Sequence, residues 1–457
     1  MEDFKKAIMR GEFRGDFTRD TFNPEKSYSR VLMQQGRVQV DADWNEQVSI
    51  HLHYLRTLVR DLGGEHWGPN KNSGFEIKLI PSSRTDFAIS KGHYYVNGIL
   101  CEADTDTTYR NQPNYFFSDA EKKEEINSGD GLMLVYLDVW ERHISYVEDD
   151  AIREVALGGP DTASRAKIIW QVKVMPLPRS GRADGNIAVN FKENYDSFLA
   201  AIKDVIKPGT GKLQASAKDK SKNDTEACLV SPESRYRGAE NQLYRVEIHN
   251  GSGIGNQATF KWSRENAAVI FPILERVDTN KSVTLVLEHL GHDNRFSLKP
   301  GNWVEIIDDD YILQNRAENL LQITAIDHEN MSVTINSVPE SDVGKFAGKH
   351  PYLRRWDQTT GDENGISVPD SSKAAAPWID LEDGIQIRFS DAAGYQSGDY
   401  WLIPARVITG DVEWPKQDGK PQEILPHGVV HYYAPLAILD KNQPAEDTRC
   451  ILIPLFL

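Results

Sequence analysis

The chain has 457 residues, 52 Lys and Arg against 68 Asp and Glu, 39% hydrophobic residues and 26% charged residues. These fractions exclude wholesale disorder and collagen-like or coiled-coil rods, and the length predicts two to four domains. The formal charge of −16 repels phosphate backbones, so nucleic acid is not expected as a partner.

Targeting signals are missing from the sequence. No run of 18 apolar residues occurs, and the N-terminus has neither the apolar stretch nor the cleavage site of a signal peptide. We therefore expect synthesis in the cytoplasm without membrane insertion. The three cysteines, Cys101, Cys228 and Cys450, are too few and too scattered for a disulfide framework or a zinc site, and are expected to be reduced thiols.

Residues 1–74 are predicted to form a docking element that consists of an arm and a helix. The first 30 residues contain four phenylalanines, and Gly11, Gly15 and Pro24 would interrupt any helix there, which is typical of an irregular arm. Such an arm becomes ordered by docking onto its own chain or onto a neighbour, and the sequence leaves both open. Its Arg14-Gly15-Asp16 run is expected to form a turn with an ion pair rather than an adhesion motif.

The helix of this element has start and stop signals. Asp43 and Glu46 have capping-box spacing, and Gly63-Gly64 supply the stop. Apolar residues at intervals of three and four predict one apolar face over about five turns. These residues are Trp44, Val48, Leu52, Leu55, Val59 and Leu62.

From about residue 75 the hydrophobic period changes to two, which predicts strands in a β domain over residues 75–178. The clearest strands are predicted at 92–98, 132–139 and 167–174. A charged run at 118–127 is expected to be a helical surface turn.

Residues 179–230 are predicted to be a helical insertion or linker. Apolar residues from Phe191 to Ile206 have helical spacing, and a polar, flexible run follows at 216–225. The region around this insertion is basic, whereas residues 357–399 are acidic, so the two could meet in a neighbouring copy. Solvated charged faces are the simpler alternative.

Two further β domains are predicted, at 231–350 and 351–457. Alternating residues at 321–326 and 331–336 predict a hairpin around a polar turn. Further strands are predicted at 385–389, 400–403, 429–433 and 451–457. The predicted fold class is therefore mainly β and multi-domain, with β-sandwich-like domains, an N-terminal arm plus helix, and one helical insertion.

No catalytic or cofactor motif is complete, so we expect neither an enzyme nor a cofactor. A run resembling a phosphate loop has Ile206 and Leu213 where a glycine and a hydroxyl are required. His427 and His431 lie about 13 Å apart if the chain between them is extended, so a structural pair is favoured over a metal site. Asp308-Asp309-Asp310 lacks the glycine and the bidentate glutamate of a calcium loop, which favours a solvated turn.

Four passages carry a further signal: RGDFTRDTF at 14–22 with YSRVLMQQGRVQVDADWNEQ at 28–47, then 136–141 with 154–165 and 170–173, 236–249 with 260–266, and 355–357 with 381–384 and 398–406. Together they resemble an uncharacterised bacterial family associated with phage-tail-like contractile injection systems (DUF6519-like). The first passage is also loosely similar to the start of phage tail-fibre and baseplate proteins.

This resemblance implies a structural or adaptor component of a contractile particle, in its baseplate or tail-fibre region. The partners would be other proteins of the particle and further copies of the chain in a homo-oligomer. Docking is assigned to residues that combine bidentate donors, an aromatic anchor and a capped helix: Arg37, Gln39, Asp41, Asp43, Trp44, Asn45 and Glu46. An equal alternative is that Arg37 and the acids hold the arm to the helix.

A second set of residues is expected to form a buried polar network at a sheet corner. Its members are Trp262, Arg264, Glu265 and Asn266. Two alternative functions stay open. Ten tryptophans would suit a carbohydrate-binding or glycan-cleaving module, which a line of exposed Trp beside paired carboxylates would reveal. A cargo protein of the particle would instead be monomeric.

Overall fold

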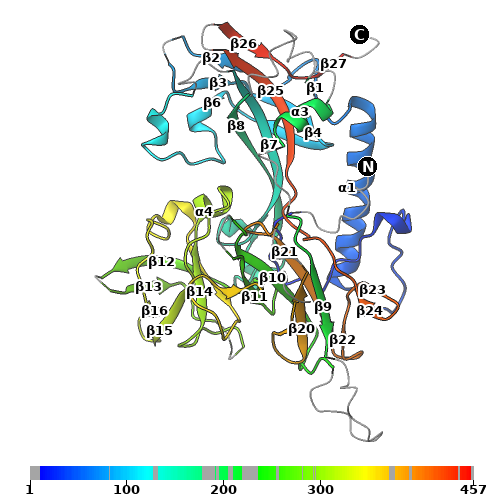
Figure 1. Cartoon of the computed structure of the whole chain (residues 1–457), viewed down its shortest axis with the longest axis vertical. Helices are drawn as coiled ribbons and strands as arrows, with labels where there is room; N and C mark the ends of the chain where they lie inside the picture. The colour runs from blue at the N-terminus through cyan, green and yellow to red at the C-terminus, as the bar shows by residue number, and fades with distance from the viewer. Residues whose placement is uncertain are drawn as a thin grey trace, which may run out of the picture.

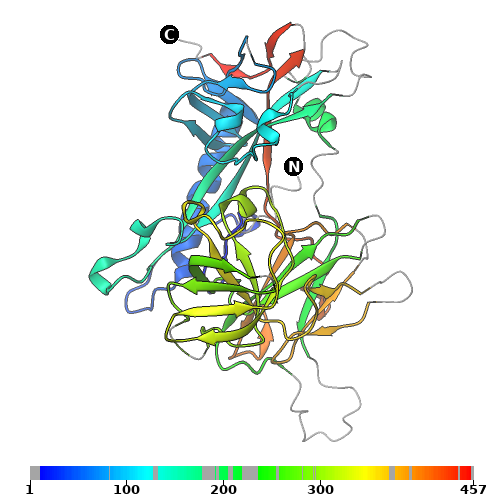
Figure 2. The same ribbon diagram turned by 90° about the vertical axis from the view of Figure 1, so that its left-hand side faces the viewer.

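The computed structural model describes residues 11–453 except 82, 127–131, 178–190, 192–194, 204–208, 219–234, 254–256, 280, 292, 294, 370–375, 391–393 and 441–442. Strands dominate and helices are few, which confirms a mainly β, multi-domain fold. Figure 1 shows an upper β domain, a barrel and a sandwich below it, and helix α1 (Asp41–Gly63) along one edge. In Figure 2 the barrel faces the viewer and α1 lies behind it.

Two long strands run down the upper domain. β7 (Met133–Ile144) and β8 (Arg165–Pro176) pair antiparallel over twelve positions, and β25 (Tyr432–Asp440) pairs with the other edge of β7. Successive residues of a strand point to opposite faces. Val135 and Leu137 accordingly enter the main core of this domain. The remaining strands of this domain are β1 (His66–Pro69), β2 (Ile77–Leu79), β3 (Phe87–Ile89), β4 (Gly92–Val96), β5 (Ile99–Ala103), β6 (Thr107–Thr108), β26 (Gln443–Asp447) and β27 (Ile451–Leu452).

The opposite face of β7 is covered by part of the predicted helical insertion. Helix α3 (Tyr195–Ala201) places Phe198 against Leu134 and Tyr136. A helix is therefore confirmed here, over a shorter range than predicted. The flexible run predicted at 216–225 begins inside a strand, β9 (Leu213–Ala217), and the rest of that run from residue 219 lies outside the described residues.

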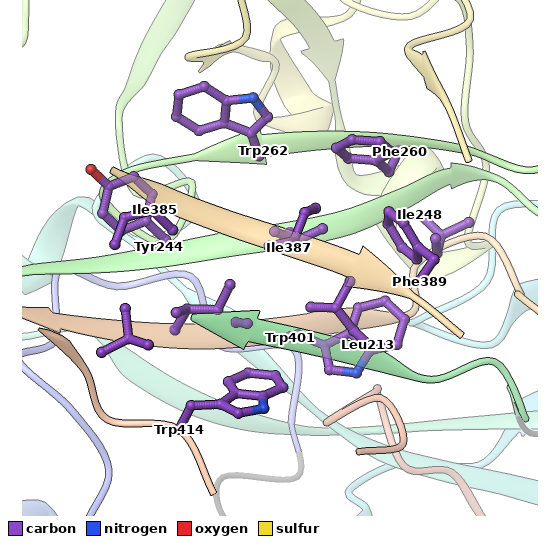
Figure 3. Packing of buried hydrophobic residues seen from close by; sticks show 14 of the residues in the cluster. Leu213, Tyr244, Ile248, Phe260, Trp262, Ile385, Ile387, Phe389, Trp401 and Trp414 are labelled. Carbon is purple, nitrogen blue, oxygen red and sulfur yellow. The ribbon is translucent and has the colours of Figure 1, made fainter. Parts of the chain in front are cut away.

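The sandwich packs a five-stranded sheet on a three-stranded sheet. Side chains of both sheets fill the space between them, among them Phe260 and Trp262 from one sheet and Ile387 and Phe389 from the other (Figure 3). The larger sheet contains β18 (Ile366–Ser367), β11 (Thr259–Ser263), β10 (Gln242–Asn250), β21 (Tyr400–Arg406) and β22 (Asp411–Val412). The smaller sheet contains β19 (Ile379–Asp380), β20 (Ile385–Phe389) and β9.

The third β body is a closed six-stranded barrel with its own apolar core. The predicted hairpin is confirmed as an antiparallel pair of its strands, β15 and β16. The barrel contains β12 (Ile270–Asp278), β13 (Val283–Leu287), β16 (Ser332–Ile335), β15 (Leu321–Asp327), β14 (Trp303–Ile307) and β17 (Tyr352–Trp356). Outside these bodies lie the short helix α4 (Asp309–Leu313) and the small hairpin of β23 (Lys416–Gln417) and β24 (Lys420–Pro421).

The domain boundaries predicted from the sequence differ from the observed ones, because strands distant in sequence share sheets. The predicted domain 351–457 is divided, since β25 returns to β7 in the upper domain whereas β20 belongs to the sandwich. The predicted domain 231–350 contains strands of both the sandwich and the barrel. The insertion supplies β9 to the same sandwich, and Lys218 pairs with Asp380 at 2.8 Å. This ion pair joins the basic and the acidic region within one chain. A contact between these regions of neighbouring copies stays a prediction.

Candidate protein-docking site

The segment between the arm and α1, residues 28–40, is held away from the body of the protein. Twelve of its 13 residues are exposed, including the predicted docking residues Arg37 and Gln39. A 3-10 turn at Pro24–Lys26 precedes the segment, and the Val31 backbone N–H donates to the Gln47 side chain at 2.8 Å. Its large apolar side chains point into solvent rather than into a core: Tyr28, Leu32, Met33, Val38 and Val40.

Helix α1 begins at Asp41, three residues before the first helical residue that the predicted capping box implies. The residue before the helix is Val40, which has no capping side chain, so the predicted capping box of Asp43 and Glu46 is wrong. The carboxylate of Glu46 instead accepts from the Thr21 hydroxyl, and that of Asp41 accepts from the backbone and the hydroxyl of Thr18. The stop signal is confirmed, since Gly64 follows the last helical residue with a φ of 89°.

The inward face of α1 is narrow and mostly polar. Only Ala42 and Ile50 of this helix are buried. Arg56 pairs with Glu141 of β7 at 2.9 Å. A Cβ atom on Gly98, in the turn between β4 and β5, would lie 2.3 Å from the Arg56 carbonyl oxygen, so the helix backbone touches this turn. These contacts fix the rotation of the helix about its axis.

The apolar face predicted for α1 is present but points outward. Trp44 is 74% exposed and Leu62 is 68% exposed. Of the other predicted residues, Val48, Leu52 and Leu55 are also exposed, whereas Val59 is half-buried. Leu58, which was not predicted to lie on this face, is exposed too. Of the 26 large apolar side chains left exposed in the described residues, twelve lie within residues 28–62. Such a concentration of exposed apolar side chains is typical of interaction surfaces.

The seven residues assigned to docking are therefore not equivalent. Arg37, Gln39 and Trp44 face solvent. Asp41 and Glu46 bind the arm. Asp43 and Asn45 lie half-buried in the first turns of α1. The alternative interpretation describes part of the set, because Asp41 and Glu46 hold the arm to the helix. Docking through the exposed Arg37, Gln39 and Trp44 stays a prediction.

The arm is anchored by buried charges that the sequence analysis missed. Arg14 donates to Glu247 of β10 at 2.7 Å and to Glu12 at 2.7 Å. Glu247 also accepts from Arg245 at 2.7 Å. Burial alone would raise the pKa of Glu247, but Arg14, Arg245 and Lys261 outweigh burial and hold that pKa well below its ordinary value. Arg14 therefore forms an ion pair, as expected, but its partners are Glu12 and the distant Glu247 of β10, which the sequence did not indicate.

A sequence signal for this anchor does exist. Along β10, Arg245, Glu247 and His249 alternate with Tyr244, Val246 and Ile248, which enter the sandwich core. A charged face on a strand normally lies in solvent, yet all three of these polar residues are buried. Buried charges must be paired. The charged face of β10 therefore predicts that charged residues from elsewhere in the chain, such as Arg14, cover it.

The four residues predicted as a polar network lie where β11 leads into the barrel. Arg264 pairs with Glu382 at 2.8 Å, and Glu265 pairs with Arg295 at 3.0 Å. Trp262 packs in the sandwich core. Asn266 donates to the carbonyls of Phe13 and Gly15 at 3.2 and 2.9 Å. The network thus joins the sandwich to the arm as well as to the barrel loops.

Two carboxyls of this network have raised pKa values. Burial first, and then the charge of Asp357, raises the pKa of Glu265 to about 7. Burial raises the pKa of Glu382 to about 7, although Arg264 opposes the shift. Both groups therefore titrate near neutrality.

A groove of about 1140 Å³ lies between α1, the arm and the barrel. Trp44, Val48 and Leu52 of α1 line it, and Phe271 of β12 lines it from the barrel. The groove is therefore continuous with the outward apolar face of the helix. Its size and partly apolar lining are typical of a site that receives a segment of another molecule.

The candidate metal ligands have other partners. Asp308 caps α4, Asp309 pairs with Arg142 at 2.8 Å, and Asp310 pairs with Lys349. His427 accepts from the Leu402 N–H at 3.0 Å, and His431 contacts Asp138 at 2.7 Å. Among the described residues, no group of three or more His, Cys, Asp or Glu side chains is arranged to hold a metal ion.

The tryptophans that suggested a glycan surface are mostly core residues. Seven of the ten are buried, and only Trp44 is exposed. A line of exposed tryptophans is therefore absent. Within the described residues, no helix has the length and apolar character needed to cross a membrane.

Comparisons with known proteins place the chain in a family without assigned chemistry. A family model described as "Family of unknown function (DUF6519)" matches residues 13–196 and 199–456, so the chain belongs to this family. No curated protein matches the sequence. Among solved structures, one described as "Crystal structure of TssK" is similar over 82% of this chain and 99% of that chain, at 8% sequence identity and a TM-score of 0.17.

Proposed function

We propose that this member of the family is a structural adaptor of a phage-tail-like contractile injection particle, placed in its baseplate or tail-fibre region and acting through protein docking rather than catalysis. The observation that carries the docking part is the exposure of residues 28–40. The particle assignment rests on the resemblance of residues 14–22 and 28–47 to the start of tail-fibre and baseplate proteins.

The exposed apolar side chains in residues 28–40 indicate that this segment binds a partner, because their burial at an interface is more favourable than their exposure to water. Val38 is 86% exposed and Leu32 is 69% exposed. Burying one such side chain at an interface contributes about 1.5–3 kcal/mol. Arg37 lies among these side chains and supplies the guanidinium that is enriched at the centres of interfaces. The segment thus offers both an apolar anchor and a directional contact.

The segment is also preorganised, which reduces the entropy lost on binding. The arm before it is fixed by the buried Arg14–Glu247 pair, and α1 after it is fixed by the Arg56–Glu141 pair. These two pairs connect the parts of the chain that flank the segment to β10 and to β7. A component that links a particle to an outward domain needs such a connection.

The test uses the full chain, tagged at its C-terminus in the native host. We expect the triple variant Leu32→Asp, Met33→Asp and Val38→Asp to be lost from gradient-purified particles while its free concentration stays unchanged. The matched control is Ile408→Asp, because Ile408 is 94% exposed in a different surface turn. Wild-type protein absent from particles, or the triple variant retained on them, would contradict the proposal.

A further inference from the structure

We propose that a second cavity, where the upper domain meets the sandwich and the barrel, binds a short neutral saccharide. The cavity has a volume of about 820 Å³, within the range of roughly 300–1,000 Å³ that small-molecule sites occupy. The long strands of the upper domain run down to the sandwich and the barrel (Figure 1), and all three bodies supply walls. This inference is independent of the proposed particle docking, and it does not need a row of exposed tryptophans.

The wall of the upper domain presents one fixed donor and one fixed acceptor. The buried Asp138 of β7 pairs with Lys173 at 2.6 Å and with Nδ1 of His431 at 2.7 Å. The His431 ring also stacks on Trp140, with ring centroids 4.6 Å apart. Because a carboxylate only accepts, Nδ1 carries the proton of the neutral ring and Nε2 is an acceptor, without a protein partner among the described residues. Lys173 is 33% exposed and has further N–H groups to donate.

The wall of the sandwich presents a second acceptor, the carboxylate of Asp399. This buried group lines the cavity, and its Oδ2 accepts from the Gln396 N–H at 2.8 Å. Burial raises the pKa of Asp399 to about 6, and within the described part of the chain no cation pairs with it. Gly209 packs against the carboxylate so closely that a Cβ atom there would overlap Oδ2. The other oxygen, Oδ1, is therefore left for a molecule in the cavity.

The charges of the cavity select a neutral ligand. Five basic and five acidic side chains line it. Most of these charges neutralise one another within the walls. Arg14 pairs with Glu247 at 2.7 Å, and Lys261 pairs with Glu305 at 2.8 Å. The lining therefore has no net charge with which to attract a phosphate or a polyamine.

The open groups of the cavity select hydroxyls. Nε2 of His431 and Oδ1 of Asp399 need donors, whereas Lys173 needs an acceptor. A hydroxyl donates and accepts through one atom, so a molecule with several hydroxyls can satisfy all three groups. Buried polar groups of this kind disfavour a ligand that leaves them unpaired. A short saccharide has both the neutral charge and the hydroxyls that the walls require.

The cavity is open to solvent between two loops. Asn315, Arg316 and Ala317 line it and are exposed. The Asn315 amide donates to the Ser397 carbonyl at 3.3 Å, which joins this loop to the turn that carries Asp399. A small molecule can therefore reach Asp399 without displacing a strand.

Isothermal titration calorimetry of the full chain tests the ligand class with glucose, galactose, N-acetylglucosamine, maltose and cellobiose. We expect at least one of these sugars to bind with a Kd of about 1 mM or tighter. The Kd should not change at high salt, because salt does not screen a neutral ligand. Inorganic phosphate and putrescine should not bind. Failure of every sugar to bind, or binding of phosphate or putrescine in their place, would overturn the proposal.

Two substitutions in opposite walls test whether the sugar binds in this cavity. Asp399→Asn keeps an acceptor for the Gln396 N–H but replaces Oδ1 by an amide group that cannot accept. His431→Phe keeps the stack on Trp140 but removes Nε2. Each change should weaken binding about tenfold. The control is Asp411→Asn, because Asp411 lies in β22 at the edge of the sandwich sheet, and it should leave the Kd unchanged.

Hydrogen exchange of the wild-type protein locates the sugar without any substitution. A bound sugar should slow the exchange of backbone amides in residues 396–399 and 427–431, which line the cavity. Protection confined to residues 28–62 would overturn the assignment to this cavity. Equal affinity of the two cavity variants and the Asp411→Asn control would overturn it as well.

Discussion

Arg14 and Glu247 are 233 residues apart in sequence, yet they form a buried ion pair with Nη1 and Oε2 separated by 2.7 Å. The pair fixes the N-terminal arm to the charged face of β10. Removing one partner of a buried ion pair is costly. Release of the arm would leave the buried Glu247 with only Arg245 and Lys261 as cationic partners. This contact connects the docking segment to the β domains.

Replacing Arg14 by methionine should release the arm locally. Breaking a buried ion pair costs about 3 kcal/mol, so backbone amides of residues 11–23 should exchange hydrogen about 100-fold faster. The control is Arg19→Met, because Arg19 and Glu413 form an exposed pair that contributes little. Equal exchange in the two variants would show that the buried pair does not hold the arm.

A second prediction concerns the close approach of α1 to the turn at Gly98. Gly98 has a φ of 79°, and a Cβ atom there would lie 2.3 Å from the Arg56 carbonyl oxygen. Gly98→Ala should therefore displace the helix, lower the thermal midpoint and increase hydrogen exchange across α1, at a cost of about 3 kcal/mol.

The matched control for this change is Gly301→Ala. Gly301 has a φ of 91°, but its Cβ atom would meet nothing within 4 Å. The Gly301→Ala variant should lose only the free energy of unfolding that the backbone strain costs, about 1 kcal/mol. If both variants lose the same stability, the contact between α1 and the turn is not tight.

Local patterns in the sequence predicted the elements but not how they associate. The periodicity of residues 44–62 predicted α1, because helical spacing is a property of neighbouring residues. It could not predict that this apolar face would point outward, since the rotation of the helix is fixed by the distant contact of Arg56 with Glu141. The predicted domain boundaries failed for the same reason, because β25 pairs with β7 across about 300 residues.

The predicted docking residues and the arm anchor also differ in whether local sequence or only the fold reveals them. Trp44 and Arg37 were predicted as docking residues because aromatic and guanidinium side chains are typical of interfaces. The role of Glu247 was missed because its partner Arg14 is brought to it only by the fold.

Acid should destabilise the sandwich through His427. Burial first, and then the charge of Arg245, lowers the pKa of His427 to about 4. Its ordinary value is 6.5, so between these values the unfolded chain binds more protons than the folded chain. Stability therefore falls as the pH drops from 6.5 towards 4.

The variant His427→Asn should reduce this pH dependence. Asparagine can still accept from the Leu402 N–H but does not titrate. We expect the slope of stability against pH to fall by at most about 1.4 kcal/mol per pH unit in that window. Urea unfolding followed by tryptophan fluorescence at several pH values measures the slope. An unchanged slope would mean that His427 does not become protonated on unfolding.

Asn266 should contribute to the stability of the docked arm in addition to Arg14. Its φ is 51°, and its side-chain amide donates to the carbonyls of Phe13 and Gly15. Asn266→Asp keeps the shape and tolerates this backbone conformation, but a carboxylate cannot donate to a carbonyl. The carbonyl oxygens of Phe13 and Gly15 would then face a negative charge. We expect this to reduce the free energy that holds the arm in place by about 2 kcal/mol.

The expected result is a protease-sensitive arm in a protein whose β domains keep their wild-type thermal midpoint. Limited proteolysis between residues 11 and 23, read by mass spectrometry, measures it. Asn266→Gly is the informative comparison, because glycine accepts the φ but also lacks the donor, so the arm should open to a similar degree. An arm that stays protected in both variants would leave the Arg14–Glu247 pair as its sufficient anchor. An arm that opens in both would show that the segment at 28–40 depends on two separate contacts for its position.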